Sequence, residues 1–407
     1  MTANGRESGE GETSASRLMN AVIGQWERCG SSAISVRSLA TEAGVTVSSL
    51  YHHFGSLEHL YLSAQLHARS GAQRWCADQL RTLARFEPLA PDALPALVAA
   101  LIDDWTNGPR GLAFAWRECV MAAAREPGFL RELQAWSAMW SAFWQDVCAR
   151  CGRVEHGALV TMFFYSESLL HLMRWHPIVD RSALADLCVG LTTWLDGSLA
   201  EEGPWRRIAR AEAIRTMPPP PVLGELSGRI ATAAAALLQR EGLAALTHRA
   251  VAAEAGLTLG VVSHHMRTSA DLVRAAFEIV YRDAAGLDDA APAPLAIDDE
   301  ELVARLIRFQ QDRTSLLALD ELMLAAGRDP ALGSFVPQLR YLRGRTSRTL
   351  MPVIAGQEGS PVDHALLSGL ISGLRVACLG SAADAVPGLV RETLEHIFAL
   401  LRRPGAG

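Results

Sequence analysis

Apolar residues recur every three or four positions over most of the chain, which is the spacing of one face of an α-helix. The strict alternation of apolar and polar residues that marks half-buried strands is missing. Ser or Thr precedes several of the apolar stretches and Gly follows them, as expected of helix caps. The pattern therefore predicts an all-α protein. The expected helices cover residues 14–29, 36–43, 47–53, 57–80, 92–105, 127–151, 154–175 and 182–200, followed by a second set near 269–285, 299–311, 330–350, 362–380 and 385–402.

Two segments of the sequence occur twice. Residues 36–54 read VRSLATEAGVTVSSLYHHF and residues 248–266 read HRAVAAEAGLTLGVVSHHM, with 8 identities in 19 positions at an offset of 212. Residues 118–127, ECVMAAAREP, correspond to residues 321–330, ELMLAAGRDP, at an offset of 203. Two repeats in the same order indicate a duplicated unit, and the smaller second offset means that the second copy is nine residues shorter between them. The chain is therefore predicted to contain two copies of one helical domain.

Each copy is divided into a short N-terminal head and a longer helical body. We place the first head at residues 14–62 and its body at 63–203, and the second head at 227–274 with its body at 275–403. Residues 204–226 between the copies include the run Pro218–Pro221, which favours a stiff, extended linker.

The pattern within each head predicts a helix-turn-helix. Leu39, Ala40 and Leu50 are apolar at the spacing that locks two short helices together, and Gly44 permits the tight turn between them. The second helix then exposes short polar and aromatic groups that suit the edges of a DNA groove, at Thr46, Val47, Ser48, Tyr51 and His52.

Residues 41–60, TEAGVTVSSLYHHFGSLEHL, resemble the N-terminal signature of the TetR family of transcriptional regulators. Residues 253–272, AEAGLTLGVVSHHMRTSADL, are similar to it. The resemblance implies a DNA-binding head and a helical body that binds a ligand and dimerises. It also implies that Arg37 and Thr46 contact phosphates, whereas Val47, Ser48, Tyr51 and His52 face the groove. The matching positions in the second copy are Arg249, Thr258, Leu259, Gly260, Ser263 and His264.

The first copy differs from the second in its tryptophans, because all ten lie within residues 1–205. A helical body that encloses a flat apolar ligand needs wide aromatic walls and few polar groups. We therefore expect a small-molecule inducer pocket in the first copy, although core packing is the alternative for any single Trp. The expected lining residues are Trp105, Trp116, Trp140, Trp144 and Phe163, with Arg117 or His171 as polar contacts.

The closing helices predict how the copies pair. Ser368, Gly369, Ser372 and Gly373 give the second copy a face of small residues, whereas residues 162–164 of the first copy are bulky. In the family that the sequence resembles, such helices form the dimer interface. A bulky face against a small face within one chain would make an intramolecular pseudo-dimer. The alternative is a homodimer of two chains that presents four heads.

Composition narrows the possible functions. All 38 basic residues are Arg, which excludes phosphate-binding loops and Schiff-base chemistry that need Lys. Seven scattered Cys residues favour reduced thiols in the cytoplasm. The sequence contains no run of about 18 apolar residues, so we expect no membrane span. We find no catalytic or metal-binding constellation and expect neither an enzyme nor a cofactor.

These features predict a ligand-responsive repressor that binds double-stranded operator DNA through two heads and is released by an apolar or aromatic inducer. The alternative function is a sensor or protein-interaction module in which the second head, or both, no longer bind DNA.

Overall fold

The structure, a computed structural model, describes residues 13–217, 224–285, 297–311, 317–344 and 347–402. Helices joined by short turns make up this part of the chain, which contains no strand, so the predicted all-α class is confirmed. The α-helices of the first half are α1 (Ser14–Arg28), α2 (Val36–Glu42), α3 (Val47–Phe54), α4 (Leu57–Leu83), α5 (Leu94–Asn107), α6 (Arg110–Arg125), α7 (Leu130–Arg150), α8 (Gly157–Leu170), α9 (Pro177–Leu195) and α10 (Pro204–Arg215). Those of the second half are α11 (Glu225–Glu241), α12 (His248–Ala255), α13 (Leu259–His265), α14 (Ser269–Ala285), α15 (Asp299–Gln311), α16 (Leu317–Arg328), α17 (Val336–Tyr341), α18 (Met351–Ala355), α19 (Pro361–Leu379) and α20 (Val386–Leu401).

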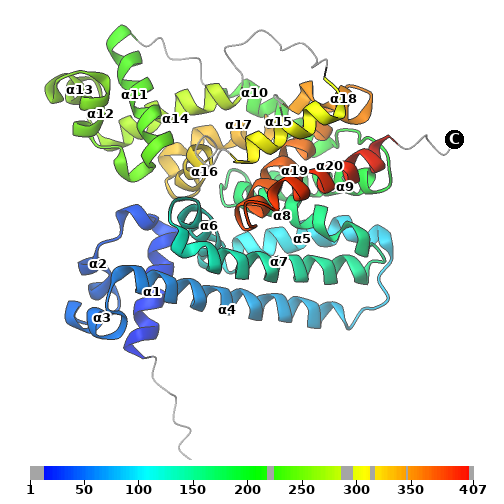
Figure 1. The fold of residues 1–407 in the computed structure, drawn as a ribbon, viewed down its shortest axis with the longest axis horizontal. Helices are drawn as coiled ribbons and strands as arrows, with labels where there is room; N and C mark the ends of the chain where they lie inside the picture. The colour runs from blue at the N-terminus through cyan, green and yellow to red at the C-terminus, as the bar shows by residue number, and fades with distance from the viewer. Residues whose placement is uncertain (1–12, 218–223, 286–296, 312–316, 345–346, 403–407) are drawn as a thin grey trace, which may run out of the picture.

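In Figure 1, α1–α7 of the first half lie below α11–α18 of the second half. Helices α1–α3 of the first half and α11–α13 of the second lie at the same end of the molecule, at the left of the view. The other helices form the rest of the molecule, and buried residues of both halves belong to one continuous hydrophobic core. Both predicted heads are therefore carried by a single packed body.

The halves meet where α8 packs against α19, and α9 adds contacts to α19 and α20. The contact between α8 and α19 depends on small residues. A Cβ atom added at Gly373 of α19 would overlap the backbone carbonyl of Met162 on α8. A Cβ atom added at Gly190 of α9 would lie 3.1 Å from the side chain of Val362. Met162, from the face predicted to be bulky, thus lies against Gly373, from the face predicted to be small.

The first part of the predicted linker is helical. Residues 204–215 form α10, which starts at Pro204. Pro suits the first turn of a helix, because a backbone N–H at this position would have no acceptor within the helix. Ala209 and Ala213 of α10 are buried where this helix packs on α9 and α17. The extended conformation predicted for the linker is therefore wrong for these residues, and the run Pro218–Pro221 lies outside the described residues.

The single helix predicted over residues 330–350 is also wrong. The structure divides this segment into a 3₁₀-helix (Pro330–Phe335), α17 and a second 3₁₀-helix, η7 (Ser347–Thr349). Gly344 stands between the last two with φ of 100°, a conformation that interrupts a helix and that other residues rarely adopt. A Cβ atom there would be 2.5 Å from the backbone of His364, so the chain also passes too close to α19 for a side chain.

Helix α19 is long and apolar enough to cross a membrane by composition alone, and no other helix of the described residues passes that test. In the structure, 72% of its apolar stretch is buried inside the protein, which is what a core helix requires.

The close approach of α8 and α19 predicts that Gly373→Ala destabilises the protein by about 3 kcal/mol or more, because overpacking against a backbone cannot be relieved by a rotamer change. Gly388→Ala in α20 is the matched control, since a Cβ atom there meets nothing within 4 Å. Removing a helical Gly at an open position stabilises by about 0.5–1 kcal/mol. Thermal unfolding should show a lower melting temperature for Gly373→Ala and a slightly higher one for Gly388→Ala. Equal melting temperatures of the two variants would contradict the packing described for α8 and α19.

Candidate DNA-binding heads and body cavities

The first head is built by local capping signals. Ser35 caps α2 by accepting a hydrogen bond from the backbone N–H of Ser38, and Thr46 caps α3 in the same way from Ser49. Between these helices Gly44 adopts φ of 61°. Leu39 and Leu50 are fully buried between the helices of the head. The sequence therefore fixes both the turn and the face of α3 that points inward.

The residues predicted to read DNA lie on the opposite face of α3. Val47 and Tyr51 are 38% and 49% exposed, which is unusual for large apolar and aromatic side chains. Ser48 and His52 are exposed beside them. Thr46 is exposed at the start of α3, where its oxygen accepts the capping bond, so its hydroxyl proton remains available for a phosphate. Arg37 is exposed near the start of α2.

The second head repeats this design. Thr247 and Thr258 cap α12 and α13, and Gly256 between them has a left-handed backbone conformation with φ of 64°. Val251 and Val262 occupy the buried positions. All the residues matched to the DNA-reading set of the first head are exposed, namely Arg249, Thr258, Leu259, Gly260, Ser263 and His264.

Two further contacts that the sequence analysis missed bind each helix-turn-helix to the helix before it. The guanidinium of Arg17 on α1 donates to the carbonyl oxygen of Ala43 at 3.0 Å, and Arg229 on α11 donates to Ala255 at 2.9 Å. These arginines are 212 residues apart, as are the carbonyls that they bond, so the repeat spacing could have revealed them.

The second of these contacts is an ion pair between the same helices. Arg28 pairs with Glu42 at 2.5 Å in the first head, and Arg240 pairs with Glu254 at 2.8 Å in the second. Both pairs again follow the offset of 212. Each of these arginines is bound to a carboxylate, which reduces the positive charge that either head offers to phosphates.

Comparison with known proteins identifies the first head. Residues 23–64 match the family described as "Bacterial regulatory proteins, tetR family". The first head therefore matches the TetR family. The HTH-type transcriptional regulator CymR of Pseudomonas putida is 33% identical over 111 residues, which cover 26% of this chain and 54% of CymR. The match thus spans about half the length of that relative.

The two halves hold the TetR-type head and its counterpart through two reciprocal ion pairs, Glu118–Arg328 and Glu321–Arg125. The carboxylate of Glu118 on α6 accepts a hydrogen bond from the hydroxyl of Ser31, in the first head, at 2.5 Å. It also accepts a hydrogen bond from Arg328 of α16, in the other half, at 2.5 Å. Arg328 reaches the first head directly as well, by donating to the carbonyl oxygen of Trp26 at 2.9 Å.

The second ion pair has the same arrangement with the halves exchanged. Glu321 on α16 accepts a hydrogen bond from the backbone N–H of Leu243, in the second head, at 2.8 Å, and it pairs with Arg125 of α6 at 2.6 Å. Burial raises the pKa of Glu321, and the charge of Arg125 opposes that rise. The short 3₁₀-helices beside these carboxylates, η1 (Ser31–Ala33) and η5 (Leu243–Ala245), contact each other. The reciprocal ion pairs therefore join both heads to both halves.

The aromatic residues of the predicted pocket lie in the core of the first half. Trp105, Trp116, Trp140, Trp144 and Phe163 are completely buried. The four tryptophan rings pack on one another or on neighbouring rings, with centroids 4.8 Å apart for Trp105 and Trp140. The four indole N–H groups have no hydrogen-bond partner among the described residues, as expected of side chains enclosed by apolar neighbours.

The two predicted polar contacts are separated in the structure. His171 is buried beside the carbonyl of Glu167, and burial lowers its pKa well below the ordinary value, so it stays neutral. Arg117 is 3% exposed and donates to the backbone of Tyr165 and to Ser168. Of the seven predicted ligand-binding residues, Arg117 is the one that borders the large cavity described next, and a ligand role for the other six stays a prediction.

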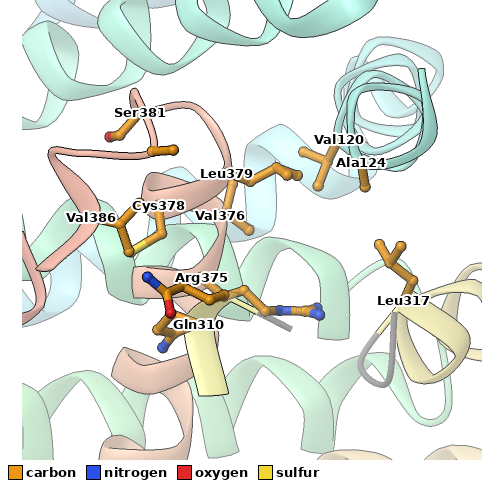
Figure 2. A pocket seen from close by; sticks show the side chains of 12 residues that line it. Val120, Ala124, Gln310, Leu317, Arg375, Val376, Cys378, Leu379, Ser381 and Val386 are labelled. Carbon is orange, nitrogen blue, oxygen red and sulfur yellow. The ribbon is translucent and has the colours of Figure 1, made fainter. Parts of the chain in front are cut away.

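A cavity of about 510 Å³ lies between the two halves. Its wall is mainly apolar and comes from α15, α16, α17 and α19 of the second half, with α6 and α8 of the first. A smaller cavity of about 140 Å³ shares Arg375 and Val376 with it. Figure 2 shows this smaller cavity between Gln310 and Arg375 on one side and Val120 of α6 on the other.

The reciprocal ion pairs predict that Arg328→Met destabilises the protein by about 3–5 kcal/mol, because it leaves Glu118 buried without its counter-ion. The side chains of this pair are 10% and 9% exposed, whereas those of the control pair, Arg28 and Glu42, are 58% and 33% exposed. Arg28→Met should therefore change the melting temperature little. The double variant Glu118→Gln, Arg328→Met should recover part of the loss. Equal effects of Arg328→Met and Arg28→Met on thermal unfolding would argue against a structural role for the buried pair.

Proposed function

We propose that this chain is a ligand-responsive transcriptional regulator that acts without catalysis, as a single-chain pseudo-dimer in the cytoplasm. Its two heads bind operator DNA, and a small apolar or aromatic ligand releases them. The observation that carries the proposal is the exposed surface of α3, with Tyr51 at its centre, in a head that matches the TetR family.

The position of the heads supports binding of both to one duplex. They lie at the same end of the molecule (Figure 1) and are joined to each other through η1 and η5. One arginine of each head, Arg28 or Arg240, is paired with a carboxylate, which reduces the positive charge that the head offers to phosphates. A head with few phosphate contacts binds weakly by itself. Two heads in one chain compensate for this, since binding of the first raises the local concentration of the second.

The reciprocal ion pairs suggest how the bodies control the heads. Glu118 and Glu321 sit on α6 and α16 and hold the 3₁₀-helix of the head in their own half. Each also pairs with an arginine of the other half. A ligand that favours a different arrangement of α6 and α16 therefore changes the distance between the heads, and shifts the population away from the form that fits DNA.

A protein-interaction module is the second candidate. It is favoured by the second head, where Ser263 stands in place of Tyr51 and the apolar side chain of Leu259 is 46% exposed. In this alternative α13 contacts another protein and only the first head reads DNA.

Selection of bound sites from random duplexes, followed by gel shift, distinguishes the two functions. The proposal expects two half-sites about one helical turn apart, roughly 34 Å. Tyr51→Ala should weaken binding to the selected duplex about tenfold or more, the effect of losing one base contact. Phe86→Ala, an exposed aromatic outside the heads, is the matched control and should leave binding unchanged. A single half-site favours the second candidate, and failure to enrich any sequence contradicts DNA recognition altogether.

The pseudo-dimer is tested by light scattering of the free protein. The proposal expects a species of 43.9 kDa, the mass of one chain. A stable species of twice that mass would favour the homodimer of two chains instead.

A further inference from the structure

The cavity between the halves lies where the second half has smaller or polar residues at positions that hold tryptophan in the first half. Four tryptophans of the first half, on α6 and α7, correspond to smaller or polar residues at the offset of 203 that relates Glu118 to Glu321. The pairs are Trp116 and Leu319, Trp136 and Leu339, Trp140 and Arg343, and Trp144 and Ser347.

The two residues of each pair have different surroundings in the structure. In the first half the four tryptophans are completely buried and pack on neighbouring rings, with Trp140 4.4 Å from Phe164 and Trp116 5.5 Å from Trp136 between ring centroids. In the second half all four counterparts line the 510 Å³ cavity. The aromatic residues therefore fill in one half the space that is open in the other.

We propose that this cavity, which the second half mainly lines, is the ligand site of the regulator and that it takes an apolar molecule with one anionic group, such as a carboxylate, which binds Arg117. This inference rests on the proposed function for its biological role. It places the ligand in the half that has no tryptophan, whereas the sequence alone pointed to the half that has ten.

The charges around the cavity identify the anion-binding group. Four arginines border it, and three of them already have carboxylate partners within 4 Å. These partnered arginines are Arg305 with Glu301 at 2.8 Å, Arg343 with Glu167 at 3.6 Å, and Arg375 with Asp320 at 3.0 Å. Arg117 is the fourth, and no ion pair joins it to a carboxylate among the residues that the structure describes.

The environment of Arg117 makes an anionic partner favourable. Its guanidinium is buried, its hydrogen bonds go to the uncharged Tyr165 carbonyl and Ser168 hydroxyl, and its Nε has no partner within the described part of the chain. Burial lowers the pKa of Arg117 to about 10, so the group is still a cation at neutral pH. A buried cation that has no ion pair is costly, and a ligand carboxylate would supply such a pair and a further hydrogen-bond acceptor.

The rest of the wall suits the apolar part of such a ligand. Leu302, Leu306 and Phe309 come from α15, Met323 from α16 and Ile371 from α19. A cavity of about 510 Å³ is of the size that holds a small organic molecule. A long-chain or ring-bearing acid therefore fits better than a compact polar anion.

The site is also connected to the heads. Arg117 directly precedes Glu118, and Asp320 of the cavity wall directly precedes Glu321. An anion that binds Arg117 and competes with Asp320 for the nearby arginines acts one residue away from both reciprocal ion pairs. Movement of α6 or α16 at the cavity is thus passed to Ser31 and Leu243 of the heads.

The test compares decanoate with 1-decanol by titration calorimetry on the full chain without DNA. The wild type should bind decanoate at least tenfold more tightly than 1-decanol, because hydrogen bonds to charged groups contribute about 10- to 100-fold in affinity. Arg117→Met should remove that preference. Arg81→Met, at a side chain that is 68% exposed on α4, should retain it. Equal affinities for the two probes in the wild type, or binding of neither, would overturn the assignment of an anionic ligand.

The location is tested by refilling the cavity. Leu319→Trp, which restores the residue found in the first half, should abolish decanoate binding, and Ser347→Trp provides a second test if the first variant does not fold. Leu66→Trp, at a side chain that is 52% exposed, is the control and should bind normally. Full decanoate affinity in both filled variants would place the ligand elsewhere. Because no DNA is present, failure here leaves the selection of operator sites as a separate test of the proposed function.

Discussion

The contact between the backbones of α8 and α19 is the constraint on which the arrangement of the two halves depends. It is possible because Gly373 presents no side chain to the carbonyl of Met162. Counted from the starts of the two helices, the position of Gly373 in α19 corresponds to Leu169 in α8. Two copies of α8 from different chains would bring a Leu side chain to this crossing. The asymmetry of the interface therefore favours pairing of α8 with α19 of the same chain.

The reciprocal ion pairs extend this constraint from the bodies to the heads. Exposed ion pairs contribute little to stability, but Glu118 and Arg328 are nearly buried, so each needs the other to offset the loss of hydration. Because the acid and the base of each pair come from different halves, α6 and α16 cannot separate without depriving Glu118 and Glu321 of their counter-ions. In the proposed regulator, a small displacement of α6 or α16 is therefore passed to the heads through Ser31 and Leu243.

The heads could be predicted from the sequence because their structure is decided by local signals. The capping residues Ser35, Thr46, Thr247 and Thr258 and the turn glycines each act within a few residues of the chain. The bodies could not be predicted as fully. Helical periodicity of tryptophans is the same for a packed core as for a pocket wall, and the break at Gly344 depends on the approach of His364, a residue distant in sequence. Likewise α10 is helical because Ala209 and Ala213 find a buried surface on α9 and α17, which no local pattern reveals.

The difference between the two halves follows from what each must do with the same helices. A core filled by Trp116, Trp136, Trp140 and Trp144 has strong packing and no room to rearrange. A half with Leu319, Leu339, Arg343 and Ser347 in their place gives up that packing and keeps an internal space that a ligand can occupy. The half with the filled core carries the head that matches the TetR family, and its Arg117 borders the cavity that the second half mainly lines. In the proposed regulator, a change at this cavity therefore reaches the first half without a rearrangement of its aromatic core. Two different halves in one chain permit this separation, because two identical chains would have to be both filled and open at the same positions.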